Sequence, residues 1–250
     1  MMQVNLSAYD IHKGPLILVN GAHPFIDDHS QSLDHITQHY PDVLMERQAA
    51  SLLQLILIRL NAVNSIVPVS GYRSFYEQSV IYSDSLKENG LDFTLKFVAL
   101  PGCSEHQTGL AIDLALNSDH IDFICPDFPY NGICQAFRKI APDYGFIQRY
   151  LTSKQSITKI AHEPWHFRYV GYPHSVIINK NDFSLEEYID YLKQYSIDHP
   201  LTFTDSHNKI EIFYVAQSEQ VIEMMDDALY QVSGNNVDGY IITQWNDDYA

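Results

Sequence analysis

Two separated stretches of the sequence carry residues whose types and spacing suit a metal ion. The first, 104–113, has His106 near its start and Asp113 inside an alternating apolar run, on a face otherwise made of glycine and alanine. A carboxylate in such a strand is costly unless it is paired or ligated. His166 in the second stretch, 161–166, supplies another nitrogen, and two nitrogens plus one oxygen, with water in the fourth position, suit a catalytic zinc site. Pairing of Asp113 with an arginine explains the pattern equally well.

The second stretch also matches a different zinc motif, H-E-x-x-H, from His162 to His166. That motif binds zinc when it is helical, because residues four apart then share one face. Pro164 would stand in the middle of the helix, where it removes a hydrogen bond and clashes with the preceding turn. The aromatic and β-branched residues 165–170 favour a strand instead. We therefore expect a strand here, and His166 to act with His106 rather than with His162.

Three separated blocks of the sequence stand out together: Ser70-Gly71-Tyr72-Arg73-Ser74, Ser104-x-His106-x-x-Gly109-x-Ala111-x-Asp113 and Glu163-x-Trp165-His166. In these residues and in their order, they resemble the signature of the zinc D,D-peptidases of the VanY/VanX/VanXY type. The resemblance covers roughly residues 15–175 and is strongest to the VanXY-type D,D-dipeptidase/D,D-carboxypeptidases.

This resemblance implies the chemistry of the site. It implies one catalytic Zn²⁺ bound by His106, Asp113 and His166. Glu163 matches the family's catalytic base and Arg73 its transition-state stabiliser. An arginine suits that role, because its charge is permanent and its planar fork can hold two oxygens.

The same resemblance gives candidates for substrate binding. Ser104 and Gln78 match positions that contact substrate in the family. Tyr72 and Trp165 are further candidates, although packing of Trp165 in the core explains its presence equally well.

Several elements must position these residues. The fold class expected is α+β, with a zinc D,D-peptidase-like central antiparallel sheet flanked by helices and a small α+β subdomain at the C-terminus. Residues 1–40 read as an irregular N-terminal segment and 91–108 as a loop. Apolar periodicity and turn signals predict helices over 41–63, 74–87, 131–141 and 184–195, and strands over 66–69, 109–116, 165–170, 210–216 and 239–245.

Charge divides the chain into a catalytic domain, 1–178, and an acidic C-terminal subdomain, 179–250, of unknown role. The second part holds 14 of the 31 acidic residues but only 3 of the 15 basic ones. The net charge of −16 argues against nucleic acid or an anionic membrane as the main partner, because both need clustered cations.

The expected location is cytoplasmic. No apolar run is long enough to span a membrane, and the first ten residues do not form a signal sequence. Three cysteines in 250 residues also fit a reducing compartment.

The expected function is hydrolysis of the D-Ala-D-Ala dipeptide, removal of the C-terminal D-residue from a muramyl pentapeptide, or both. The resemblance implies a role in vancomycin resistance or cell-wall remodelling. The alternatives are a related wall metallopeptidase of other specificity, such as an L,D-peptidase or endopeptidase, and a non-catalytic zinc-dependent binding module. No oligomeric state is predicted.

Overall fold

The computed structural model describes residues 2–26, 32–205, 208–224, 226 and 229–246, which group into two compact units. One unit is Val19–Ser184 and contains all three sequence blocks. The other combines Met1–Leu18 with Leu185–Ala250. This division differs from the sequence-based boundary at residue 178, because the N-terminal residues group with the C-terminal ones.

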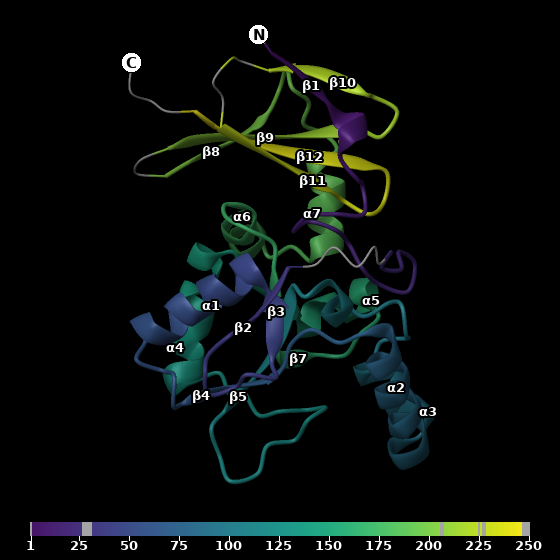
Figure 1. Ribbon diagram of the computed structural model, residues 1–250, viewed down its shortest axis with the longest axis vertical. Coiled ribbons are helices and arrows are strands. Elements are labelled where there is room, and N and C mark those ends of the chain that lie inside the picture. The colour runs from purple at the N-terminus through teal and green to yellow at the C-terminus, as the bar shows by residue number, and fades with distance from the viewer. Residues whose placement is uncertain (1, 27–31, 206–207, 225, 227–228, 247–250) are drawn as a thin grey trace. The chain divides into compact units, whose positions relative to one another are not determined.

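A four-stranded antiparallel sheet organises the Val19–Ser184 unit (Figure 1). Pro68 lies in an edge strand, where its missing N–H leaves no gap inside the sheet. The α+β class with a central antiparallel sheet is confirmed. The strands in spatial order are β4 (Ile66–Ser70), β5 (Ala111–Leu116), β7 (Glu163–Tyr169) and β6 (Phe146–Tyr150).

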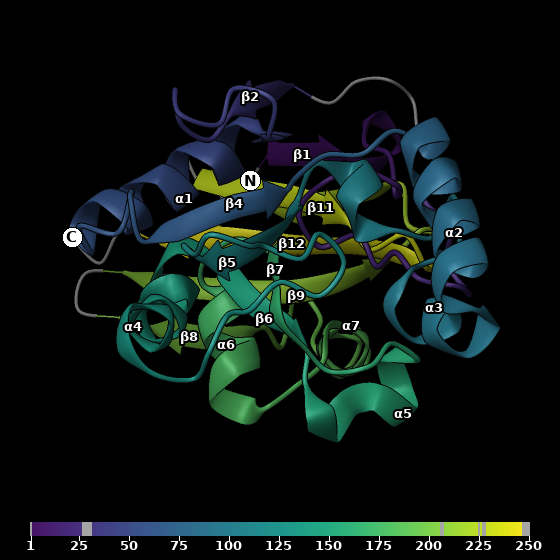
Figure 2. The same cartoon turned by 90° about the horizontal axis from the view of Figure 1, so that it is seen from below.

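The helices of this unit gather in two groups. Helices α2 (Phe75–Asn89) and α3 (Leu91–Phe97) lie side by side at one end, away from α1 (Arg47–Arg59) and α4 (Gly132–Ile140), as Figure 2 shows from below. Two further helices, α5 (Gln155–Thr158) and α6 (His174–Asn181), follow β6 and β7. Ser74 caps α2 reciprocally with Glu77, so the predicted start of this helix is confirmed.

Two sequence predictions in this unit are wrong in part. The expected helix 41–63 is shorter, because Leu44–Glu46 (β3) pairs with Leu33–His35 (β2) and Glu46 then caps α1. The expected loop 91–108 contains α3, whose Phe93 and Phe97 rings pack with centroids 4.8 Å apart, and a 3₁₀ turn, η2 (Glu105–Thr108). The apolar pattern revealed neither the strand pairing of β2 with β3 nor the packing of the Phe93 and Phe97 rings.

The other unit is also α+β. Its antiparallel sheet has the order β11 (Leu229–Gly234), β12 (Gly239–Asn246), β9 (Lys209–Ala216) and β8 (Leu201–Thr204), with helix α7 (Leu185–Leu192) preceding it in the chain.

The N-terminus is not irregular throughout, because it contributes a strand to this second unit. Met2–Asn5 (β1) pairs antiparallel with Val221–Met224 (β10). Val4 and Leu6 are buried in one cluster with Phe213, Tyr240 and other residues of the C-terminal strands. Within the residues described, no helix has the length and apolar character needed to cross a membrane.

Candidate active site

The register of the central sheet brings Asp113 and His166 together. Asp113 on β5 is the direct cross-strand partner of His166 on β7. Directly opposed side chains of an antiparallel pair lie on the same face of the sheet. Their oxygen and nitrogen atoms, Oδ1 and Nδ1, are 2.9 Å apart.

His106 reaches the same place from η2. Gly109 ends this turn with φ of 73°, in the left-handed region that favours glycine, and the chain then enters β5. The Gly71 carbonyl oxygen lies 2.7 Å from His106 Nδ1 and fixes the orientation of the imidazole. A Cβ at Gly71 would stand 2.1 Å from the Leu44 carbonyl oxygen, so this close approach requires glycine. The other nitrogen of His106, Nε2, lies 3.1 Å from Asp113 Oδ2.

These three side chains form a donor set that fits a metal ion. One ligand atom from each of His106, Asp113 and His166 lies within 4.8 Å of the others, and all three residues are buried. In each imidazole one nitrogen faces Asp113. The other nitrogen has an acceptor elsewhere, the Gly71 carbonyl for His106 and the Glu105 carboxylate for His166. Buried imidazole nitrogens and a carboxylate oxygen are ligands that zinc takes in proteins.

Glu163 shares this face because the sheet is irregular beside it. Between β6 and β7, Gln148 pairs with Phe167 but Tyr150 pairs with Glu163, so β7 carries extra residues over this interval. A bulge of this kind re-aims a side chain. Glu163 Oε2 thus lies 3.8 Å from His166 Nδ1, although residues three apart in a regular strand face opposite ways.

Arg73 approaches the site from the turn after β4. Its Nη2 donates to Asp113 Oδ2 at 2.9 Å and its Nε donates to Ser70 Oγ at 2.7 Å. Gln78 accepts a hydrogen bond from Nη1 at 3.3 Å and donates through Nε2 to the Ala99 carbonyl. Gln78 therefore holds the guanidinium from α2, and Asp113 has both an arginine and two histidines around it.

Burial and charge set unusual protonation preferences here. Burial raises the pKa of Glu163 to about 8, although the nearby His166 favours its ionised form. Burial lowers the pKa of His106 to about 4, and the charge of Arg73 adds to this effect. Burial also opposes the charge of His166, but its hydrogen bonds with Asp113 and Glu105 outweigh burial and raise its pKa to about 9. Asp113 and Glu105 thus favour the protonated, positively charged form of the His166 imidazole.

An open cavity lies over these groups. Ser104, Gln78 and Trp165 line it, as do the metal-donor residues, Arg73 and Glu163. Trp165 is 7% exposed, so it is both packed and at the cavity wall. Tyr72 is not among the residues that line it.

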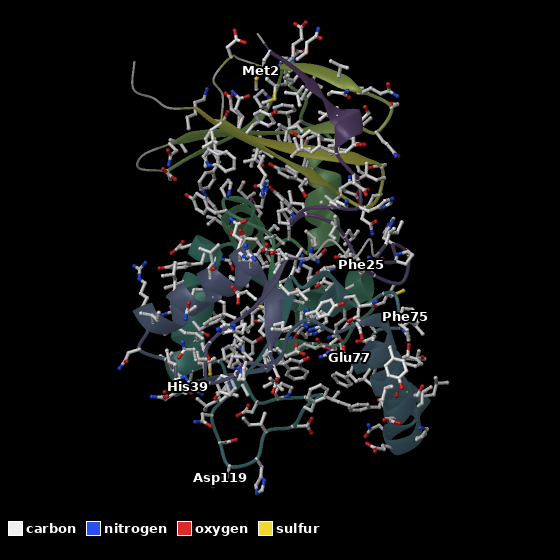
Figure 3. All side chains as sticks on the ribbon, viewed as in Figure 1. Met2, Phe25, His39, Phe75, Glu77 and Asp119 are labelled. Atoms are coloured by element: carbon white, nitrogen blue, oxygen red, sulfur yellow. The ribbon has the colours of Figure 1, made fainter. Side chains whose placement is uncertain are left out.

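The loop 117–131 between β5 and α4 closes one side of the cavity. Figure 3 shows Asp119 at the outer tip of this loop, and the returning part supplies Phe123 and Ile124 to the cavity wall. The Phe123 ring centroid lies 5.5 Å from Arg73 Cζ. This loop was not predicted from the sequence.

Three charged residues beneath the site were also missed. Glu105 lies between His166 and two arginines, Arg149 and Arg168, and all are buried. Two of them carried a signal, since Glu105 stands next to His106 and Arg168 shares a strand face with His166. Nothing in the sequence pointed to Arg149.

The H-E-x-x-H match does not form a helical zinc site. Its residues from Glu163 onward lie in β7, as expected from the aromatic and β-branched run. His162 lies outside the donor set, with Nδ1 3.0 Å from the Tyr150 carbonyl and Nε2 3.0 Å from the Tyr130 hydroxyl.

An antiparallel sheet that brings a His–Asp–His donor set beside a buried glutamate is the arrangement expected of a metallopeptidase. The family model "VanY: D-alanyl-D-alanine carboxypeptidase" matches residues 42–172. The chain therefore belongs to the VanY family of D-alanyl-D-alanine carboxypeptidases.

Relatives of known structure and activity support this placement. The chain is 52% identical to the vancomycin-resistance D,D-dipeptidase VanXYg, solved with a D-Ala-D-Ala phosphinate analogue, with a TM-score of 0.93 and 98% of each chain covered. It is 47% identical to the bifunctional D-Ala-D-Ala dipeptidase and carboxypeptidase VanXYC of Enterococcus gallinarum, over 61% of this chain and 81% of that protein. VanY from a VanB-type resistance cassette, solved with Zn(II), is 28% identical with a TM-score of 0.60, covering 70% of this chain and 98% of that one.

Proposed function

We propose that this chain is a zinc-dependent D,D-peptidase that hydrolyses D-Ala-D-Ala, removes the terminal D-residue from peptidoglycan pentapeptide precursors, or does both. One observation carries the proposal: His106, Asp113 and His166 converge beside Glu163 in a chain that matches VanXYg over 98% of its length. The role that follows is resistance to vancomycin or remodelling of the cell wall. We expect a cytoplasmic location, which cell fractionation tests.

One Zn²⁺ held by His106, Asp113 and His166 would polarise the scissile carbonyl and lower the pKa of a bound water to about 7. Glu163 accepts a proton from the attacking water and returns it to the leaving amine. Glu163 lies 3.8 Å from the metal-donor residue His166, and a carboxylate placed in this way can serve as base and then as acid.

Arg73 stabilises the negative charge that develops on the carbonyl oxygen. Its guanidinium lines the cavity and is fixed by Ser70 and Gln78. Such fixed donors need little reorganisation during the reaction. Ser104 and Trp165 are the proposed substrate contacts at the cavity wall. Gln78 also lines the cavity and accepts a hydrogen bond that holds Arg73 in place. Tyr72 does not line the cavity, so its contact with substrate stays a prediction. A Tyr72→Phe variant assayed on the substrate panel below tests it.

The test is the Glu163→Ala variant of the full chain. We expect it to keep zinc and to lose at least about 10²–10⁴-fold in the rate of D-Ala release, the usual contribution of a positioned base. Retained hydrolysis would overturn the proposal. The matched control is His162→Ala, which removes the neighbouring histidine outside the cavity and should keep both zinc and activity.

A substrate panel then defines the specificity. It compares the D-Ala-D-Ala dipeptide with muramyl pentapeptides that end in D-Ala, D-Ser or D-lactate, and adds a tetrapeptide with an L,D terminal bond. Cleavage of the L,D bond alone would favour the related L,D-peptidase. Zinc binding without any cleavage would favour a binding module.

A further inference from the structure

The two oxygens of the Glu105 carboxylate have different partners. Oε1 accepts hydrogen bonds from Arg149 Nε at 2.9 Å and from Arg168 Nη1 at 3.0 Å. Oε2 faces the imidazole of His166 and lies 3.4 Å from its Nε2. These four side chains come from η2, β6 and β7 and are each at most 3% exposed.

The two arginines fix the carboxylate in place. Both guanidinium groups lie within hydrogen-bond distance of Oε1, so their charges favour the ionised form of the carboxylate. A rotation of Glu105 away from them would break both buried ion pairs, which is costly. The carboxylate is therefore held outside the His–Asp–His donor set, with one oxygen directed at His166.

This contact determines which nitrogen of His166 is available. An ionised carboxylate can only accept hydrogen bonds, so Nε2 must carry a proton and donate it. The lone pair of the metal-bound form is then on Nδ1, the atom 2.9 Å from Asp113 Oδ1. His106 is governed in the same way by the Gly71 carbonyl, with Nε2 left available. Each ligand imidazole thus has its own acceptor, and the two expose different nitrogens.

We propose that Glu105, held by Arg149 and Arg168, is a positioning residue that fixes the tautomer and orientation of His166 for metal binding. The inference rests on the proposed zinc site. Partners of this kind typically contribute 10–100-fold to metal affinity. The same 3₁₀ turn would then carry one ligand, His106, and the group that orients the other.

The first test is the zinc affinity of the full-length Glu105→Gln variant, measured by competition with a chromophoric chelator. Glutamine keeps the size but replaces an acceptor by an amide that also donates, and it no longer specifies a proton on Nε2. We expect zinc to bind about 10–100-fold more weakly. Unchanged zinc affinity would overturn the proposal.

Thr108→Val is the matched control for a purely structural effect. Thr108 is buried in the same turn, and its hydroxyl donates to the Glu105 carbonyl at 2.6 Å and accepts from the Leu110 amide. It is not part of the donor set. We expect this variant to lose stability but to keep its zinc affinity.

Two further measurements keep the inference testable. ¹⁵N NMR of the zinc-loaded chain should show His166 bound through Nδ1 with a protonated Nε2, and Glu105→Gln should perturb that signal and leave His106 unchanged. If Glu105→Gln does not fold, Glu105→Asp keeps the charge facing the arginines but shortens the side chain, and weaker zinc binding is again expected. Wild-type affinity in a folded Glu105→Asp variant would contradict the proposal.

These results separate the inference from the proposed function. A wild-type chain that binds no zinc and cleaves no D-Ala-D-Ala would overturn the function itself. A wild-type chain that binds zinc and cleaves substrate, with a Glu105→Gln variant of equal affinity, would overturn only the role of Glu105.

Discussion

The two units of the molecule treat charge in opposite ways. The Val19–Ser184 unit buries Glu105, Asp113, Arg149, Glu163 and Arg168 as well as three histidines. In the described part of the other unit, the buried polar residues are uncharged: Ser233, Asn235, Asn236, Thr243 and Gln244. Yet most of the chain's net charge lies in the C-terminal residues.

The comparison teaches that burial, and not the number of charges, marks the reactive part. A carboxylate on the surface keeps its water and interacts weakly with its neighbours. A buried carboxylate must find cations or hydrogen-bond donors, so it organises the residues around it. Most of the net charge of −16 belongs to residues 179–250, so it says little about the site.

The largest expected effect is the loss of the donor set. His106→Ala combined with Asp113→Ala should abolish zinc binding and hydrolysis, because one nitrogen alone remains from the site. Zinc content by elemental analysis after dialysis is the measurement. Zinc that persists undiminished would favour the His162/His166 pair instead and would break the assignment of the buried cluster.

Next is Arg168→Met, which removes one arginine of the buried group beneath the site. We expect the free energy of unfolding to fall by about 3–5 kcal/mol, the usual cost of breaking a buried ion pair. Chemical denaturation measures it, with Lys193→Met as the control, since the Lys193 pair with Asp238 is partly exposed. Equal losses in both variants would remove the contrast between the units.

Arg73→Lys should lower kcat by about 10²–10³-fold, the usual cost of losing an oxyanion donor. Lysine keeps the charge but cannot reproduce the bonds that Arg73 makes to Asp113, Ser70 and Gln78. Steady-state kinetics on D-Ala-D-Ala separates this from a change in KM. A variant with wild-type kcat would restrict Arg73 to a structural role.

His174 provides a pH-dependent test in the same unit. Burial lowers its pKa to about 3, so the folded state keeps it neutral while the unfolded chain protonates near pH 6.5. Stability is therefore lost as pH falls below 6.5. Between pH 7.5 and 5.5, the wild type should lose about 1.4 kcal/mol more than His174→Gln. Parallel denaturation curves at both pH values would contradict this.

The smallest effect is expected in the acidic unit. Asp198→Asn, Glu219→Gln and Glu223→Gln alter exposed residues and remove three negative charges. Surface changes of this kind usually alter stability by less than about 0.5 kcal/mol each. Activity on D-Ala-D-Ala should stay unchanged. A clear loss of activity would mean that these surface charges affect the site, and would contradict the conclusion that the net charge says little about it.

The sequence by itself indicated which residues could form the site and predicted much of its scaffold. The alternating run that contains Asp113 and the β-branched run around His166 each predict a strand, because both signals depend only on residues that are close in the sequence. Pro164 and the aromatic and β-branched run after it argued against a helix at the H-E-x-x-H match. The cap at Ser74 could be predicted for the same local reason.

Only the tertiary structure decided how these residues meet. The pairing of Asp113 with His166 is a matter of register, and a shift of one residue would turn either side chain to the other face. The irregular pairing that places Glu163 beside His166 depends on Tyr150 in a strand that the sequence did not reveal.

The buried pairing of Glu105 with Arg149 and Arg168 depends likewise on residues distant in the chain. Sequence patterns fix which groups are present and how their own strands or turns alternate. Register, bulges and buried ion pairs are set by contacts between segments, and those contacts are made only when the chain has folded.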